Sequence, residues 1–187
     1  MEGRHQAHNA AIAVACVELL REQGVAVPDS AVATALGKLQ CAGRVEKVSL
    51  PDQTTAILDA AHNQDSIDAL CRCIQQRFAD EKIVVVFGTS EDKTPQPMLN
   101  SLAGVADEMI LTQFRGNPRF LPASKLLPLV PDSWSDTVLT IQDPIKAAAA
   151  GLASAGPGGV MVVCGSFFLV AETRSWLRQR AAQISSA

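Results

Sequence analysis

Short continuous runs of hydrophobic residues mark the second half of the chain. They cover residues 83–87, 109–112, 137–141 and 160–164, and helix-sized segments separate them. Runs of this length are typical of strands that are buried on both faces of a mostly parallel sheet. The alternation of strands and helices therefore predicts a doubly wound α/β domain over residues 43–187, with helices on both faces of the sheet.

A β-hairpin is expected to begin this domain. Polar and apolar residues alternate at 44–48, Pro51-Asp52-Gln53 forms a turn, and 54–58 returns as the second arm. The helices expected between and after the later strands lie at 66–78, 96–103, 124–130, 144–155 and 168–184.

Two predicted helices precede the sheet domain. Apolar residues recur with helical spacing from residue 7 to residue 22, and Gly24 follows as a C-terminal stop. Pro28-Asp29-Ser30 opens a second, short helix. Two helices cannot bury their apolar faces alone, so residues 1–42 are expected to pack onto the sheet domain or to self-associate through the first helix.

Composition and charge exclude several classes of protein. The net charge of -3 argues against a nucleic-acid-binding surface, which would be basic. No apolar run reaches the length of a membrane span and the N-terminus has no signal-peptide pattern, so we expect a cytoplasmic protein. The five cysteines lack Cys-x-x-Cys pairs, and we expect them to be small buried side chains without a metal.

The segment from Ala56 to Asn63 is the most informative for function. An apolar strand ends there on Asp59, and His62 and Asn63 follow at once. In an open α/β sheet, ligands bind in the crevice outside the carboxyl ends of the strands, so these side chains are candidates for contacting a ligand. The alternative is structural, because Asn63 or Asp65 could simply cap the next helix.

Polar residues also follow two other predicted strands, at 88–93 and at Gly165-Ser166. A small residue followed by Ser at a helix start can hold an anion through free N–H groups and the helix dipole, and a lysine adds positive charge. Lys93 and Ser166 therefore suit a carboxylate or a phosphate, unless Ser166 only caps its helix and Lys93 is a solvated charge. The basic loop at 113–121 has two similar interpretations, a functional loop or a surface connection.

Common catalytic motifs are missing from the sequence. There is no Gly-x-x-x-x-Gly-Lys-Ser/Thr P-loop and no Gly-x-Gly-x-x-Gly dinucleotide motif. Gly165-Ser166 lacks the flanking glycines of a hydrolase nucleophile elbow, and His62 has no evident acid partner downstream. These absences disfavour a hydrolase and a dinucleotide-dependent enzyme.

Five motifs, in order, resemble the folylpolyglutamate synthase and dihydrofolate synthase family, a branch of the Mur-type amino-acid ligases. They are His5-Gln6-x-x-Asn9-Ala10-Ala11, Gly43-Arg44-Val45-Glu46, Asp59-Ala60-Ala61-His62-Asn63, Ser90-Glu91-Asp92-Lys93 and Gly165-Ser166-Phe167-Phe168-Leu169-Val170. Together they extend over nearly the whole chain.

This resemblance implies an ATP-dependent ligase. ATP, with Mg²⁺, would phosphorylate a carboxylate of folate or dihydropteroate, and the amine of L-glutamate would displace phosphate to form an amide. Residues 1–42 would be the last helices of the family's central ATP-binding domain, and residues 43–187 its Rossmann-like C-terminal glutamate ligase domain. The sequence does not distinguish dihydrofolate synthase from folylpolyglutamate synthase activity, because the pterin pocket would lie mostly in the other half.

The resemblance also implies site residues. On the ATP side it implies Asn9, Arg44, Asp59 and His62: Asn9 would contact the adenine, Arg44 the phosphates, and Asp59 and His62 would reach the nucleotide from the C-terminal domain. On the glutamate side it implies Lys93 and Ser166.

The sequence departs from the family's motifs at several positions. Ala60 and Gln64 stand where the family has Gly and Pro, Cys41-Ala42 stands where it has Trp-Pro, and Phe168 replaces a Tyr. Without a P-loop, the chain lacks what would bind the β- and γ-phosphates. We therefore expect a fragment or split half of such a ligase, inactive alone. The alternatives are a non-catalytic binding module derived from such a domain and, less favoured, a ligase acting on cell-wall precursors.

Overall fold

A computed structural model describes residues 4–38 and 41–184. The chain divides into two compact units, Met1–Ala42 and Gly43–Ala187. The first unit contains helices α1 (Arg4–Glu22) and α2 (Asp29–Lys38). Arg21, in the last turn of α1, holds their connection: its guanidinium donates to the Val27 carbonyl oxygen at 2.8 Å and to Asp29 at 2.7 Å.

The described side chains of the first unit form almost no core of their own. No residue of α2, which is described in full, is buried. Large apolar side chains are exposed at Ile12, Leu19, Leu20, Val25 and Leu36. The amphipathic helix predicted from the sequence is therefore present, but this unit does not cover its apolar side chains.

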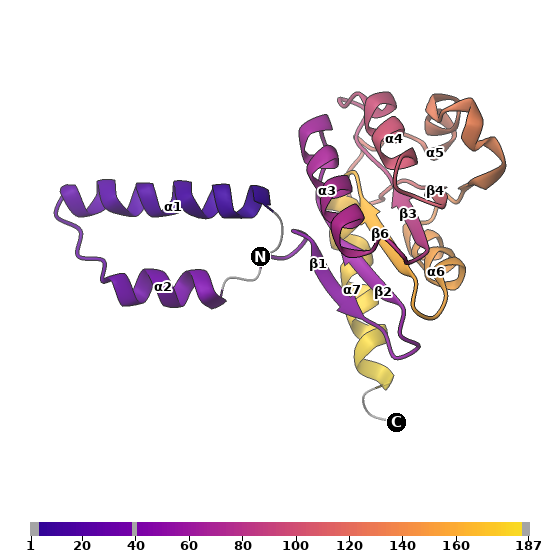
Figure 1. Ribbon diagram of the computed structural model, residues 1–187. Helices are drawn as coiled ribbons and strands as arrows, with labels where there is room; N and C mark the ends of the chain where they lie inside the picture. Colours follow the sequence, from indigo (N-terminus) through magenta and orange to yellow (C-terminus); the bar gives the residue numbers. More distant parts are fainter. Residues whose placement is uncertain (1–3, 39–40, 185–187) are drawn as a thin grey trace. The chain divides into compact units, whose positions relative to one another are not determined.

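The second unit is an α/β domain (Figure 1). Its strands are β1 (Glu46–Ser49), β2 (Thr55–Leu58), β3 (Ile83–Phe87), β4 (Glu108–Leu111), β5 (Val138–Thr140) and β6 (Val160–Cys164). Its α-helices are α3 (Gln64–Arg77), α4 (Pro95–Ala103), α5 (Ala123–Leu126), α6 (Pro144–Ala155) and α7 (Phe167–Ile184), and 3-10 helices cover Leu127–Leu129 and Asp132–Thr137. No helix in the described part of the chain is long and apolar enough to cross a membrane.

The six strands form one sheet in the order β1-β2-β6-β3-β4-β5. β1 pairs antiparallel with β2 as a hairpin, and every other pair is parallel. Alternate residues of the strands face two separate apolar clusters. One cluster lies under α3, α4 and α5, and the other under α6 and α7. The mostly parallel sheet with helices on both faces that the sequence predicts is confirmed.

Short polar motifs begin the helices that follow the strands. Asn63 caps α3, because its side chain accepts the Ser66 N–H at 2.9 Å while the Ser66 hydroxyl oxygen accepts the Asn63 N–H at 3.2 Å. Between Asn63 and Asp65, which the sequence left open, Asn63 is thus the cap. Asp143 caps α6 through the N–H groups of Ile145 and Lys146.

Three expectations from the sequence are wrong. The strand predicted at 137–141 is not buried on both faces, since β5 is an edge strand and Leu139 is 54% exposed. The helix predicted at 124–130 ends at Leu126, because Pro128 cannot continue an α-helix and the chain tightens into a 3-10 turn. Cys71, Cys73 and Cys164 are buried as expected, but Cys16 and Cys41 are exposed.

Candidate functional site

At the carboxyl edge of the sheet, neighbouring strands are followed by helices on opposite faces. β6 lies between β2 and β3, and the three strands are parallel. The helices that follow β2 and β3 cover one face, whereas α7, which follows β6, covers the other. The loop after β6 therefore runs to one face of the sheet, whereas the loops after β2 and β3 run to the other. In α/β sheets, the divergence of neighbouring loops opens a crevice in which ligands bind. The three polar junctions singled out in the sequence meet here.

Two glycines allow the backbone at the ends of neighbouring strands to approach closely, Gly165 between β6 and β3 and Gly88 between β3 and β4. Gly165 has φ 103°, and a Cβ there would lie 2.6 Å from the carbonyl oxygen of Gly88. A Cβ at Gly88 would lie 2.7 Å from the carbonyl oxygen of Thr112. A larger residue fits at neither position without a shift of the backbone. The sharp turn at Gly165 brings Ser166 to the crevice at the start of α7.

A cleft of about 180 Å³ opens at this edge. Its walls come from the segments that follow β2, β3, β4 and β6. The lining residues are His62, Ser90, Asp92, Lys93, Arg119, Gly165, Ser166, Phe167 and Phe168. The structure thus brings together three of the residues proposed from the sequence, namely His62, Lys93 and Ser166.

His62 is held in one orientation at the cleft. Its Nδ1 lies 2.9 Å from the carbonyl oxygen of Ala60. That oxygen can only accept a hydrogen bond, so Nδ1 is the donor; in the ring that carries one proton, Nε2 is then an acceptor. The imidazole packs 5.4 Å, centroid to centroid, from the ring of Phe167.

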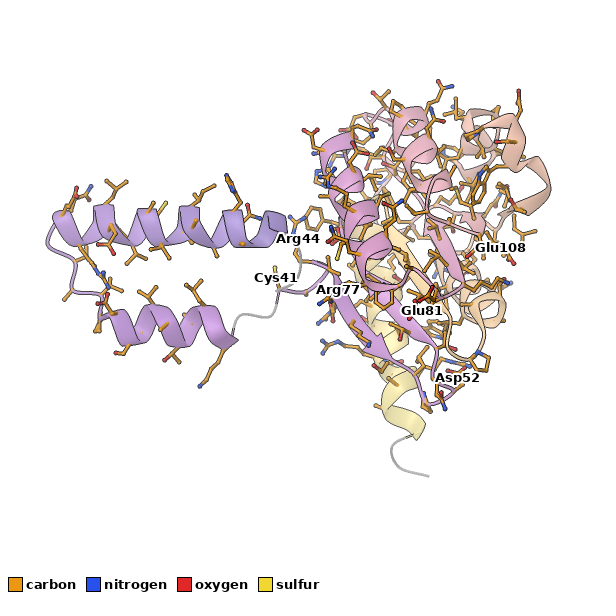
Figure 2. The ribbon with its side chains drawn as sticks, viewed as in Figure 1. Cys41, Arg44, Asp52, Arg77, Glu81 and Glu108 are labelled. Carbon is orange, nitrogen blue, oxygen red and sulfur yellow. The ribbon has the colours of Figure 1, made fainter. Side chains whose placement is uncertain are left out.

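Arg44 contacts the same aromatic ring. Its guanidinium carbon lies 5.2 Å from the centroid of Phe167, a cation–π distance. Among the described residues, no carboxylate forms an ion pair with Arg44. Figure 2 shows Arg44 at the end of the sheet opposite Asp52, which lies in the β1–β2 turn. Phe167 therefore links a guanidinium, able to bind an anion, to the imidazole at the cleft.

Asp59 holds backbone on two sides of the site. It is 4% exposed. Its Oδ2 accepts the N–H of Val45 at 2.7 Å, and its Oδ1 accepts the N–H of Ala61 at 2.8 Å. The carboxylate thus ties the residue after Arg44 to the segment that carries His62. The nucleotide contact that the sequence suggested for Asp59 stays a prediction.

Positive charge predominates at the cleft. Lys93 Nζ lies 3.1 Å from Asp92. The hydrogen bond from Lys93 holds the pKa of Asp92 below its usual value, although desolvation opposes it; the charge of Lys93 and, to a lesser extent, that of Arg119 act in the same direction as the hydrogen bond. Two fixed cations and one ionised carboxylate therefore face the space, together with the hydroxyl of Ser166. Ser166 also caps α7, because its Oγ accepts the Phe168 N–H at 3.1 Å.

Arg119 was not identified from the sequence, although its loop was. The loop reaches the cleft because it pairs with the segment after β3: Ser90 and Phe120 form an antiparallel bridge, and the Glu91 N–H donates to the Arg119 carbonyl oxygen at 2.9 Å. The signal available in the sequence was the excess of basic residues in a long loop at a strand's carboxyl end. Which of its arginines faces the cleft depends on this pairing.

Asn9 lies on α1, in the helical unit, and its side chain is exposed. The contact of Asn9 with adenine that the resemblance implies stays a prediction.

Comparisons with known proteins agree with this architecture. Residues 43–167 match the family model for the Mur ligase, glutamate ligase domain, and the chain belongs to this family. Within it, the chain is 29% identical over 180 residues to the dihydrofolate synthase/folylpolyglutamate synthase of Bacillus subtilis, covering 94% of this chain and 40% of that protein. It is also 32% identical over 142 residues to the UDP-N-acetylmuramyl-tripeptide synthetase of Lactobacillus acidophilus, covering 67% of this chain and 27% of that protein.

A solved structure from the folate branch has the same fold. The Mycobacterium tuberculosis folylpolyglutamate synthase complexed with ADP superposes with a TM-score of 0.80 and 27% identity, covering 95% of this chain and 41% of that one. The relatives with matches over most of this chain include folylpolyglutamate synthases, which are ligases of folate metabolism. This chain spans about two fifths of their length.

Proposed function

We propose that this chain is the glutamate-binding part of an ATP-dependent ligase that adds L-glutamate to folate or dihydropteroate. The observation that carries the proposal is the charge pattern of the cleft. Lys93 and Arg119 are cationic and Asp92 is anionic, whereas glutamate has two carboxylates and one ammonium group. The two cations of the cleft thus match the two carboxylates of glutamate, and its one anion matches the ammonium group. The cleft of about 180 Å³ is also smaller than the roughly 300–1,000 Å³ of pockets that take drug-sized ligands.

Lys93, Arg119 and Ser166 would bind the carboxylates of glutamate. The Arg119 guanidinium can grip a carboxylate with two parallel N–H groups, and the Lys93 ammonium acts as a point charge. The Ser166 oxygen already accepts the Phe168 N–H, so its O–H remains available as a donor. Placing both carboxylates leaves the amine to be oriented by an acceptor.

His62 would stand between the glutamate and the nucleotide. With the proton on Nδ1, its Nε2 can accept a hydrogen bond from the amine of glutamate, which must lose a proton before it attacks an acyl group. Through Phe167, His62 is also connected to Arg44, whose guanidinium would meet nucleotide phosphates. Asn9 would contact the adenine, and Asp59 would support this side of the site.

ATP and Mg²⁺ would supply the activation of the carboxylate, because phosphoryl transfer converts it to an acyl phosphate that an amine can displace. The residues described above fit the outer part of such a nucleotide site, since Arg44 offers a guanidinium without an ion pair among the described residues. The sequence has no P-loop to surround the β- and γ-phosphates. We therefore propose that residues 1–42 complete an ATP-binding domain and that the chain is inactive alone.

The proposal is tested by NMR titration of the ¹⁵N-labelled chain with L-glutamate. Shifts confined to the amides around Lys93, Arg119 and Ser166 are expected, together with weaker binding of glutarate, which lacks the amine. An assay with ATP, dihydropteroate and glutamate should give no product with this chain alone. Absence of glutamate binding, or turnover by the chain alone, would contradict the proposal.

The exposed apolar residues of α1 and α2 favour a second candidate function, that of a binding module without chemistry. In this case the helical unit would pair with a second copy of the chain, because exposed apolar stripes on two identical helices can bury each other. A module of this kind predicts self-association without binding of glutamate or nucleotide.

A further inference from the structure

Glu172, in α7, binds the backbone of the loop that follows β4. A single carboxylate oxygen, Oε1, accepts the N–H groups of Arg115 and Gly116, both at 2.7 Å. The other oxygen lies 3.7 Å from Nε of Arg115. Hydrogen bonds from two successive N–H groups to an ionised oxygen are stronger than neutral ones. Glu172 thus fixes the backbone at the start of the loop.

The loop is built to accept this carboxylate. A Cβ at Gly116 would lie 3.2 Å from the Glu172 oxygen, so a glycine allows the close approach. Phe114, two residues before Gly116, is fully buried, and its ring centroid lies 5.2 Å from that of Phe168 in α7. The Arg115 guanidinium extends the contact to Asp143, the cap of α6, at 3.1 Å.

A short backbone segment connects the residues bound by Glu172 to Arg119. The side-chain oxygen of Asn117 accepts the Arg119 N–H at 2.9 Å, which makes a tight local turn. The Arg119 carbonyl oxygen in turn accepts the Glu91 N–H at 2.9 Å. Glu172 holds one end of the segment 115–119, and the segment after β3 holds the other. Arg119 is therefore carried by backbone that is fixed on both sides.

We propose that Glu172 is a positioning residue: by holding the N–H groups of Arg115 and Gly116, it sets where the Arg119 guanidinium stands in the cleft, and so sets the affinity for the carboxylate of the amino-acid substrate. This inference rests on the proposed function, in which the cleft binds L-glutamate. Glu172 itself does not touch the substrate. Its effect is transmitted through four residues of backbone.

The test is a double-mutant cycle on glutamate binding, measured by NMR titration of the chain. Glu172→Ala should raise the Kd for L-glutamate about tenfold, equal to 1.4 kcal/mol, and should speed amide hydrogen exchange at Arg115 and Gly116. In an Arg119→Ala background, Glu172→Ala should add almost nothing, because it acts through Arg119. A carboxylate that only stabilised α7 would instead give additive losses.

Glu108→Gln is the matched control. Glu108, labelled in Figure 2, is the first residue of β4. It forms an ion pair with Lys82 at 2.6 Å and accepts a hydrogen bond from the Ser154 hydroxyl. Removing this charge should leave the Kd unchanged. Gly116→Ala provides a second variant that keeps every charge, and it should weaken glutamate binding in the same direction as Glu172→Ala.

The outcomes separate the two proposals. If the folded wild-type chain binds no glutamate, the proposed function fails and this inference fails with it. If the wild-type chain binds glutamate but Glu172→Ala leaves the Kd unchanged, or lowers affinity equally with and without Arg119, only the positioning role of Glu172 is overturned.

Discussion

The carboxylate of Asp59 accepts the backbone N–H of Val45 at 2.7 Å, and Val45 has φ 47°, a left-handed backbone that β-branched residues rarely adopt. A conformation of this kind costs roughly 1–3 kcal/mol and persists only where its surroundings impose it. The hydrogen bond to Asp59 stabilises this conformation of Val45. A second hydrogen bond holds the backbone just before it, because the Ala60 N–H donates to the Gly43 carbonyl oxygen at 2.8 Å. Arg44 lies between these two contacts.

Asp59→Ala should destabilise the sheet domain. The buried N–H groups of Val45 and Ala61 would lose their acceptor, at roughly 1–3 kcal/mol for each unpaired group. Asp59→Asn should cost less, since an amide oxygen can still accept one of the two bonds. Urea unfolding at pH 7 measures both. Equal stability of wild type and Asp59→Ala would show that the carboxylate does not hold the backbone.

Lys93→Ala should mainly weaken the binding of glutamate. The change removes one of the two cations at the cleft, and a charged hydrogen bond is worth roughly 1.5–3 kcal/mol, so the Kd should rise by at least tenfold. Lys125→Ala, which removes an exposed charge on α5, is the control. In a complete ligase the KM for glutamate should rise more than the KM for ATP, and equal increases would contradict the assignment of Lys93.

Glu46 should make stability depend on acid pH. Burial opposes its ionisation, but hydrogen bonds from Arg174, the Gly43 N–H and Arg178 outweigh burial and hold its pKa below the ordinary 4.5. A lowered pKa in the folded state gives stability that is complete above pH 4.5 and is lost as the pH falls through the folded value.

Glu46→Gln tests this dependence. At pH 7 the variant should be less stable by roughly 1–3 kcal/mol. The difference between wild type and variant should shrink as the pH falls below 4.5, because the wild-type carboxyl then also becomes neutral. Urea unfolding across this range measures it. A difference that stays constant with pH would mean that ionisation of Glu46 does not contribute.

Gly165→Ala should be strongly destabilising, by roughly 3 kcal/mol or more. The new Cβ would lie 2.6 Å from the Gly88 carbonyl oxygen, in addition to requiring φ 103°. Gly158→Ala is a matched control, because Gly158 has φ 81° with nothing within 4 Å of a new Cβ. Its cost should be only about 1–2 kcal/mol. Equal thermal shifts for the two variants would show that the contact with Gly88 is unimportant.

Removal of the helical unit should abolish self-association of the chain. The apolar side chains of Ile12, Leu19 and Leu36 are exposed, whereas the sheet domain has its own core on each face. Sedimentation velocity of the full chain and of residues 43–187 measures this. The full chain should form dimers as its concentration rises, and the shorter chain should remain monomeric. The same oligomeric state in both would exclude α1 and α2 as the interface.

The sequence predicts strands best where both faces of the strand are buried. The runs that became β3 and β6 are apolar throughout because each strand is buried on both faces. The run at 137–141 contains Thr137 and Thr140, and it became an edge strand with Leu139 exposed. Strand order depends on long-range pairing, which the composition of one segment does not contain.

The candidate site was predictable only in part for the same reason. His62, Lys93 and Ser166 follow the carboxyl ends of parallel strands, so topology alone brings them to one edge. Arg119 reaches the cleft through the bridge between Ser90 and Phe120, which is a tertiary contact. The hydrogen bond from the Val45 N–H to Asp59 likewise joins two segments, one before β1 and one after β2, that no local sequence pattern connects.

The place of β6 in the sheet also determines when the domain can fold. β6 follows the other five described strands in sequence, yet it pairs on both of its edges. Val160 lies opposite Thr55 of β2 on one edge and opposite Ile83 of β3 on the other. During synthesis, β2 and β3 must wait with open edges until Val160–Cys164 leaves the ribosome. Such long-range pairing slows folding and leaves unpaired strand edges open to aggregation. The cleft therefore cannot form before this central strand has been synthesised.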